Sequence, residues 1–190
     1  MKFNEILNCY HYGSVVYKTN KPSSDIDYIA IVEKLEKEQF LSSYIDINFY
    51  SKENFDYQLN QCKIWALECY FLKDEHILKQ SYPLSLKLDK DKLRRSIRDQ
   101  TEKSYVKAKK KLTIEIGQEK IGLKSYWHSL RILMFGIQLS NYGKIINYQE
   151  ANYLYDKILS YKDWYSLDSD FNSLYKSLTK EFRELTPIKK

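Results

Sequence analysis

Two short segments in the first fifty residues have the hydrophobic spacing of β-strands. The run "DYIAIV" (27–32) is a short apolar segment, typical of a buried strand. In "YIDINFY" (44–50) apolar and polar residues alternate, which predicts a strand with Ile45, Ile47 and Phe49 on one face. The other side chains of this strand would lie on the opposite face: Tyr44, Asp46, Asn48 and Tyr50.

Helical spacing is expected on both sides of these strands. The segment "KFNEILNCY" (2–10) predicts a short helix that packs through Phe3, Ile6 and Leu7. Ser51 is a suitable N-cap for a second helix. Its apolar positions recur at helical spacing through Phe55, Leu59, Cys62, Trp65 and Cys69.

The second half of the chain is predicted to be helical. Helices are expected over 91–115, over 123–142 with Gly143 as a left-handed cap, over 149–161 and over 168–184. The "DSD" at 168–170 is expected at a helix N-terminus, where acidic side chains are favourable. The pattern therefore predicts a small α/β unit followed by a helical half, divided near residue 85.

Composition places this 190-residue chain among soluble proteins with a real core, since 43% of its residues are hydrophobic and 29% are charged. Cys62 and Cys69 are expected as small core residues in a reducing compartment, and a structural zinc site is not expected. No secretory signal is visible, and "RILMFGIQL" is too short to cross a bilayer. We expect a cytoplasmic protein with no membrane association.

The positive charge is concentrated in one segment. Residues 87–111 contain eleven Lys or Arg and four Asp or Glu, an excess of seven within a chain whose net charge is +6. Such a segment suggests an anionic partner, either nucleic acid, a nucleoside triphosphate or an acidic surface. The alternative is a solvated helix face with no partner.

Candidate chemistry lies at the start of the first apolar strand. Asp25 and Asp27 are two residues apart, so both carboxylates point to the same face and repel each other unless a cation neutralises them. Mg²⁺ prefers one or two carboxylates together with phosphate oxygens. These residues predict a two-metal site for phosphoryl or nucleotidyl transfer, and Asp46 is a candidate third carboxylate that orients the attacking hydroxyl.

A phosphate-binding turn is predicted ten residues before this pair. Gly13 lets the backbone approach a phosphate, while the hydroxyl of Ser14 and neighbouring N–H groups donate to its oxygens. Lys18 and Lys21 follow in the connecting loop and are expected to neutralise triphosphate charge.

The stretch "GSVVYKTNKPSSDIDYIAIV" resembles the signature of the DNA polymerase β-like nucleotidyltransferase superfamily, which has Gly-Ser, about ten residues and then Asp-x-Asp. The resemblance implies that Gly13 and Ser14 bind the NTP phosphates and that Asp25 and Asp27 hold two Mg²⁺, with Asp46 as the third carboxylate. Mn²⁺ is the alternative ion, and ATP is the favoured NTP. Many minimal members have Arg-Gly where this chain has Tyr17 and Lys18.

The resemblance also implies a fold. The expected class is α+β, with a small mixed β-sheet core (residues 1–85) that has helices on one side, followed by a helical domain (86–190). A looser likeness over 45–72 and 124–145 is to a bacterial and phage branch of nucleotidyltransferases, some of them linked with RNA repair.

Three further residues are candidates for nucleotide binding. Lys124, His128 and Arg131 are spaced to share one face of a helix, where they would meet the triphosphate or an acceptor phosphate. The alternative is a half-buried histidine beside Trp127 with two solvated cations. Glu68, an acid within the apolar "WALECYF", is expected to pair with one of those cations in a structural salt bridge.

The function that these features favour is metal-dependent transfer of an NMP from an NTP to an acceptor hydroxyl. The basic segment 87–111 and the RNA-repair-like branch favour an RNA end, such as a tRNA, as the acceptor. A protein hydroxyl, as in AMPylation, comes next, and an aminoglycoside would suit an acidic cleft better. A non-catalytic nucleotide- or RNA-binding module and a two-metal nuclease are the competing classes.

Overall fold

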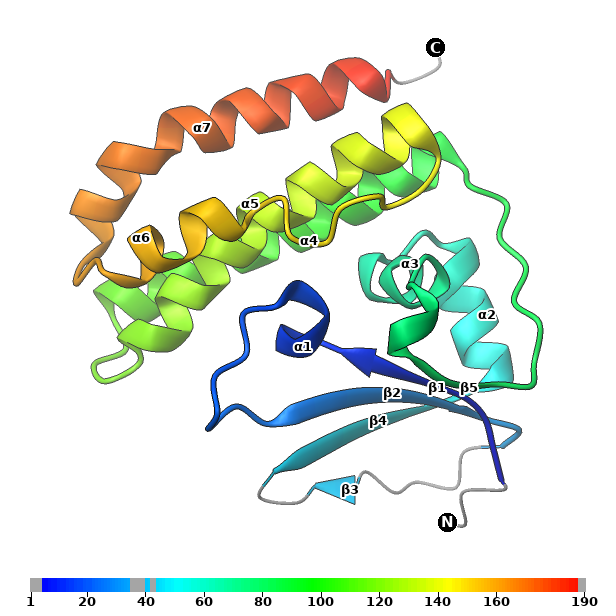
Figure 1. Cartoon of the computed structure of the whole chain (residues 1–190). Coiled ribbons are helices and arrows are strands. Elements are labelled where there is room, and N and C mark those ends of the chain that lie inside the picture. The colour runs from blue at the N-terminus through cyan, green and yellow to red at the C-terminus, as the bar shows by residue number, and fades with distance from the viewer. Residues whose placement is uncertain (1–4, 35–39, 42–43, 188–190) are drawn as a thin grey trace. The chain divides into compact units, whose positions relative to one another are not determined.

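The computed structural model describes residues 5–34, 40–41 and 44–187, and the chain forms two compact units, residues 1–88 and 89–190 (Figure 1). The first unit contains β1 (Ile6–Tyr12), α1 (Ser14–Tyr17), β2 (Ile26–Val32), β3 (Phe40–Leu41), β4 (Ile45–Ser51), α2 (Lys52–Asn60), α3 (Ile64–Tyr70), the 3₁₀ turn η2 (Asp74–His76) and β5 (Ile77–Gln80). The second contains α4 (Lys90–Thr113), α5 (Glu119–Tyr142), the 3₁₀ turn η3 (Asn152–Leu154), α6 (Tyr155–Leu159) and α7 (Trp164–Leu185).

The described strands form one mixed sheet in the order β3-β4-β2-β1-β5. The pair β2–β4 is parallel, whereas β1–β2, β1–β5 and β3–β4 are antiparallel. Figure 1 shows α2 and α3 over the same face of this sheet. The predicted α+β class, with a small mixed sheet, helices on one side and a helical C-terminal region, is confirmed.

The two faces of the sheet separate as the alternation in the sequence predicts. Ile47 and Phe49 of β4 pair with Tyr28 and Ala30 of β2 and pack on one face of the sheet. On the other face Tyr50 stacks on Trp65 of α3, with ring centroids 4.3 Å apart. Stacked aromatic rings thus attach the helices to the face that also carries Asp46.

The predicted N-terminal helix is wrong. Phe3 lies outside the described residues, but Ile6–Tyr12 is the strand β1, which pairs with both β2 and β5. Asn8 is fully buried there, and its side chain bonds to both the N–H and the C=O of Tyr82 at 2.9 Å. The strand partners of this backbone lie fifteen or more residues away along the chain, so the local pattern of nine residues does not reveal them.

The helix predicted after Ser51 is two helices. Ser51 does cap α2, because its Oγ accepts the N–H of Asn54 at 3.2 Å. The chain then breaks at Cys62, whose φ of 54° is left-handed, and α3 begins at Ile64. Apolar residues keep helical spacing across this break, so the hydrophobic spacing alone predicted one continuous helix. Cys62 and Cys69 are buried in the core, as predicted.

In the second unit the predicted helices occur with shifted ends. Asp89 caps α4 by accepting the N–H groups of Asp91 and Lys92, and Gly143 ends α5 with a left-handed φ of 68°. The predicted helix over 149–161 is a 3₁₀ turn and a five-residue helix. α7 begins at Trp164 behind the cap Asp163, so "DSD" lies inside the helix and not at its start. There Asp168 accepts a hydrogen bond from Tyr105 at 2.5 Å.

No helix within the described ranges is long and apolar enough to span a membrane.

Candidate active site

Asp27 and Asp46 lie directly opposite each other on the parallel strands β2 and β4. Neighbouring strands are about 4.8 Å apart, and paired residues point to the same face. Two carboxylates at this separation repel each other, and like charges directly opposite destabilise a sheet. The parallel register therefore creates an anionic pair that a cation would stabilise.

Asp25 lies one residue before β2 begins, on the face of Asp27 by alternation, and it is exposed. The strand is attached at this point because the N–H of Ile26 donates to the carbonyl of Tyr44 at 3.0 Å. Three carboxylates thus come from two adjacent chain segments, with Asp25 closest to the connecting loop.

Gly13 packs against this carboxylate group. It follows β1, where Tyr12 pairs with Asp27, and its φ of 67° is in the left-handed region. A Cβ atom at position 13 would lie 2.2 Å from Oδ2 of Asp27. Only glycine satisfies both the conformation and the close approach. The atom closest to such a Cβ is this oxygen of Asp27, and phosphate binding at Gly13 stays a prediction.

Ser14 begins α1 directly after this glycine. The carbonyl of Gly13 accepts the N–H groups of Val16 (3.1 Å) and Tyr17 (3.2 Å), which closes the turn. Ser14 is half-buried, and its carbonyl accepts the N–H of Thr19 at 2.9 Å. Ser14 therefore directly follows the glycine that approaches Asp27.

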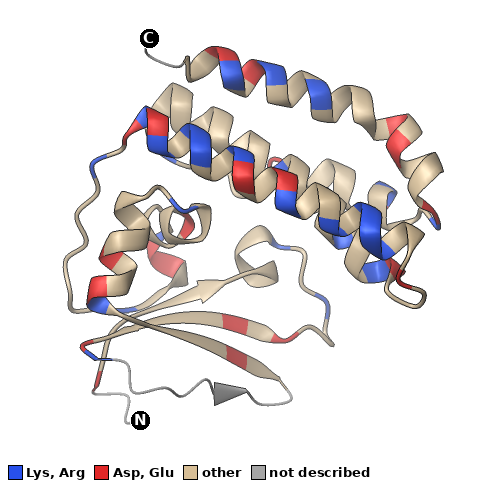
Figure 2. Cartoon of the chain, turned by 180° about the vertical axis from the view of Figure 1, so that it is seen from behind, with Lys and Arg blue, Asp and Glu red and all other residues tan. Residues whose placement is uncertain are grey.

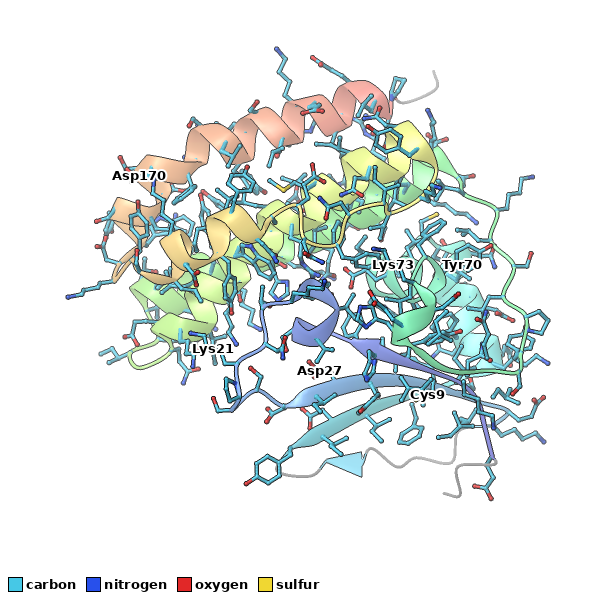
Figure 3. All side chains as sticks on the ribbon, in the orientation of Figure 1. Cys9, Lys21, Asp27, Tyr70, Lys73 and Asp170 are labelled. Atoms are coloured by element: carbon cyan, nitrogen blue, oxygen red, sulfur yellow. The ribbon has the colours of Figure 1, made fainter. Side chains whose placement is uncertain are left out.

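Lys18 and Lys21 are exposed in the loop between α1 and β2, and Figure 3 labels Lys21 there and Asp27 on β2. Lys18 ends α1 with a left-handed φ of 56°. Lys21 and Ser24 close a turn by two bonds of 2.9 Å, one from the N–H of Lys21 to Oγ of Ser24 and one from the N–H of Ser24 to the carbonyl of Lys21. This loop returns the chain from the glycine turn to the first aspartate.

Tyr17 and Glu68 support the turn, and sequence reasoning assigned neither this role. Tyr17 is 2% exposed and Glu68 of α3 is 1% exposed, and the phenol hydroxyl donates to Oε2 of Glu68. This bond ties the short α1 to α3. In the sequence, the isolated acid in "WALECYF" was the only sign that Glu68 has a structural role. The cationic partner predicted for it belongs to the second unit, and that pairing stays a prediction.

Lys124, His128 and Arg131 do share one face of α5. Nη2 of Arg131 lies 2.9 Å from Nδ1 of His128, and its guanidinium lies over the rings of Trp127 (5.4 Å) and Phe135 (5.2 Å). Burial and the nearby cations, Arg131 first, hold the pKa of His128 well below 6.5. The imidazole is therefore neutral. Whether this cluster meets the aspartates stays a prediction.

The carboxylates suit Mg²⁺ together with a phosphate ligand better than Mg²⁺ alone. Among the residues that the structure describes, no group of three or more His, Cys, Asp or Glu is gathered closely enough to hold a metal by itself. Mg²⁺ usually takes one or two carboxylates and completes its shell with water and substrate phosphates. The facing pair Asp27–Asp46 supplies two hard oxygen donors of that kind.

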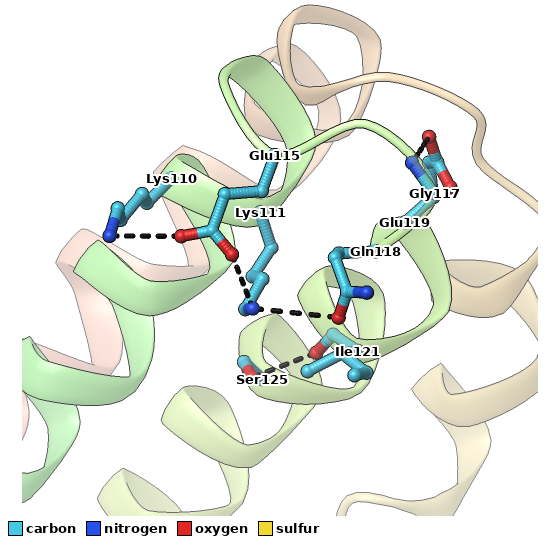
Figure 4. Close-up of polar contacts among 8 residues, drawn as sticks. All are labelled: Lys110, Lys111, Glu115, Gly117, Gln118, Glu119, Ile121 and Ser125. Atoms are coloured by element: carbon cyan, nitrogen blue, oxygen red, sulfur yellow. Dashed lines mark hydrogen bonds and ion pairs between the residues drawn. The ribbon is translucent and has the colours of Figure 1, made fainter.

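The basic segment forms most of α4, where Lys and Arg outnumber Asp and Glu along the helix (Figure 2). At its end Lys110 and Lys111 both pair with Glu115, Lys110 at 2.9 Å (Figure 4). These bonds lower the pKa of Glu115 to about 2. Lys103 and Lys107, one to two turns earlier, are exposed. These two lysines are candidates for binding the phosphate backbone of a nucleic acid.

Comparison with known proteins gives few matches. No protein-family model matches the chain, and no curated protein matches it. Among solved structures, a similar chain is spectinomycin adenyltransferase AAD(9) from Enterococcus faecialis, crystallised with ATP and spectinomycin. The two share 14% sequence identity with a TM-score of 0.49, over 95% of this chain and 93% of that chain. The function proposed below rests on the residues of this chain.

Proposed function

We propose that this protein is a metal-dependent nucleotidyltransferase, which moves an NMP from an NTP to an acceptor hydroxyl and releases pyrophosphate. The facing carboxylates of Asp27 and Asp46 on parallel strands carry the proposal. Their repulsion has no evident benefit for folding, and it is relieved when a cation and a phosphate bind. Gly13 approaches Asp27 closely, and Ser14 follows it. Together they supply the proposed triphosphate-binding turn.

The proposed reaction is a single displacement at phosphorus. The acceptor oxygen forms a bond to the α-phosphorus, the bond to the oxygen bridging to the β-phosphorus breaks, and pyrophosphate leaves with that electron pair. Asp46 accepts the hydrogen bond of the acceptor hydroxyl, orients its lone pair and takes its proton. Asp25 and Asp27, with Asp46, would hold Mg²⁺ or Mn²⁺. Bound metal would lower the pKa of the hydroxyl and neutralise phosphate charge.

The remaining candidates serve in binding the nucleotide, for which ATP is favoured. Lys18 and Lys21 project from the loop beside the aspartates and suit the β- and γ-phosphates. From α5, Lys124, His128 and Arg131 are proposed to contact the triphosphate or the acceptor phosphate. The neutral His128 would do so as a hydrogen-bonding group and not as a charge.

The proposed acceptor is an RNA end, such as that of a tRNA. Exposed lysines of segment 87–111 would bind backbone phosphates, a mode of binding that weakens steeply with salt. Transfer to a protein hydroxyl is the second candidate. A module that binds nucleotide or RNA without catalysis is the third, and the presence of all three carboxylates disfavours it.

The test is labelling with each α-³²P-NTP in the presence of Mg²⁺, total RNA and lysate protein. The wild type is compared with Asp25→Ala/Asp27→Ala, and Asp74→Ala, an exposed acid elsewhere in the first unit, is the matched control. Label on RNA that only the double variant abolishes supports the proposal. Label on protein moves the acceptor to a polypeptide. If the protein binds nucleotide but transfers no label to RNA, protein or added aminoglycoside, the proposed transferase activity is contradicted.

A further inference from the structure

The helical unit contains a groove that the proposed reaction does not use. It has a volume of about 340 Å³, within the range of small-ligand sites, and residues of α4, α5 and α7 line it. Its polar lining is mainly cationic, and its apolar lining comes from aromatic and aliphatic side chains: Arg94, Arg98, Thr101, Glu102, Leu133, Tyr175, Thr179, Phe182 and Arg183.

Thr101 is a buried hydroxyl that lacks a partner. It is 2% exposed, and its Oγ1 makes no hydrogen bond to any residue that the structure describes. Several other hydroxyls in or at the end of the helices of this unit donate to a carbonyl of the preceding turn: Ser125, Ser129, Ser140, Thr179 and Thr186. Burying a hydroxyl without a partner is costly, so a ligand atom in the groove would complete this site.

Three arginines line the same groove as this hydroxyl. Nη1 of Arg94 donates to the carbonyls of Arg183 (3.0 Å) and Thr186, which holds its guanidinium at the C-terminal end of α7. Arg98 donates to its neighbour Asp99 at 2.9 and 3.1 Å and is half exposed. Arg183 is exposed in the last turn of α7.

One acid lines the groove together with these cations. Glu102 also lines the groove, so the lining carries a net charge of about +2, which favours an anion. Burial raises the pKa of Tyr175, Glu102 raises it further and Arg183 lowers it, which places both charges close to this phenol.

The apolar lining suits a flat ring. The ring of Tyr175 stacks on Tyr105 with centroids 4.4 Å apart, so it is held rigidly at the edge of the groove. Leu133 and Phe182 supply further apolar surface. Arginine with a rigid aromatic ring is the combination that binds a phosphate and a base together.

We propose that this groove is a second ligand site, which binds a phosphorylated nucleoside with its phosphate on Arg98 and Arg183, a phosphate or ribose oxygen on Thr101 and its base against Tyr175. The source is either a free mononucleotide or the terminal nucleotide of an RNA. This site does not depend on the proposed transfer reaction.

The experiment is calorimetric titration of AMP into the full chain at low salt, in an Asp27→Asn/Asp46→Asn background that removes the facing carboxylates of the candidate active site. One AMP per chain is expected to bind. Arg98→Gln/Arg183→Gln should weaken binding at least about tenfold and Thr101→Val about fivefold. Glu102→Gln should strengthen it severalfold because it removes the acid that lines the groove.

The groove also offers matched controls. Thr179→Val changes a lining hydroxyl that is already bonded to the carbonyl of Tyr175, and Arg95→Gln removes an exposed α4 cation that does not line the groove. Each should change affinity less than about twofold. Circular dichroism confirms that each variant is folded.

Three results would overturn the site: no saturable AMP binding, equal losses in the control variants, or competition by inorganic phosphate as effective as that by AMP. If a 5′-phosphorylated oligoribonucleotide displaces AMP more effectively than its unphosphorylated form, the ligand is an RNA end. If neither oligonucleotide displaces AMP, the ligand is a free nucleotide.

Discussion

Gly13 and Asp27 touch across neighbouring strands, so closely that a Cβ atom on residue 13 would lie 2.2 Å from a carboxylate oxygen of Asp27. Gly13→Ala must displace this carboxylate and also strain a left-handed φ of 67°. We expect a loss of about 1–3 kcal/mol in the free energy of unfolding and at least tenfold weaker Mn²⁺ binding with ATP. Urea unfolding and Mn²⁺ paramagnetic relaxation measure the two effects.

Gly117→Ala is the control for that variant. Its φ of 79° is also positive, but a Cβ atom there would meet nothing within 4 Å. Of the two added Cβ atoms, only the one at residue 13 meets Asp27. Equal Mn²⁺ binding in both would show that the contact does not position the carboxylate.

The repulsion between Asp27 and Asp46 predicts that Asp46→Asn is more stable than the wild type without metal and less stable than it when metal and ATP are bound. Without Mg²⁺, Asp46→Asn is expected to raise stability by about 0.2–1 kcal/mol because it removes a directly opposed charge. With Mg²⁺ and ATP the wild type should gain stability and the variant should not. Thermal unfolding in both conditions measures this, and a variant that gains as much as the wild type would exclude Asp46 from the metal site.

The Tyr17–Glu68 bond predicts a supporting role for Tyr17. Tyr17→Phe keeps the ring but removes the donor to a buried carboxylate, which is expected to cost about 1–3 kcal/mol of stability. Nucleotide transfer should also slow, because α1 carries the Gly13–Ser14 turn. Tyr57→Phe, at an exposed position on α2, is the control and should be neutral. An unchanged unfolding midpoint in Tyr17→Phe would refute this role.

His128 predicts a pH dependence of stability. A guanidinium can only donate, so Nδ1 of His128 accepts from Arg131 and stays unprotonated. As the pH falls below 6.5, His128 binds a proton in the unfolded chain but not in the folded chain. The free energy of unfolding therefore falls. The slope is up to about 1.4 kcal/mol per pH unit between pH 6.5 and 5.

Burial and His76 lower the pKa of His11 also, which adds a slope of the same sign. The measurement therefore compares His11→Gln with His11→Gln/His128→Gln by urea unfolding from pH 5 to 7.5. The second variant should show the flatter profile. Parallel profiles would mean that His128 binds its proton equally in both states.

The basic segment predicts salt-dependent RNA binding. Replacing Lys103 and Lys107 by glutamine should reduce the slope of log K against log salt by about 0.7–0.9 for each lysine that contacts a phosphate. Lys144→Gln/Lys162→Gln removes two exposed cations outside residues 87–111 and should leave the slope unchanged. Equal slopes in all three proteins would exclude α4 from RNA binding.

The sequence by itself determined the features that depend on neighbouring residues. Strand alternation placed Asp46 and Tyr50 on the face opposite Ile47, because the period of two is a property of the extended backbone. The caps at Ser51 and Gly143 were identifiable because a cap is set by the conformation and hydrogen bonding of one residue. The candidate residues were identifiable for the same reason, since Gly-Ser and Asp-x-Asp lie within fifteen residues.

Only the tertiary structure decided which of these residues meet. The parallel register of β2 and β4 sets Asp27 against Asp46, and the return of β1 to β2 sets Gly13 against Asp27. Strand pairing also made Ile6–Tyr12 a strand, because β2 and β5 bond to its backbone on both sides. Such contacts join segments distant along the chain. The free energy of these contacts outweighs the local conformational preference of each segment. The hydrophobic spacing of neither segment reveals them.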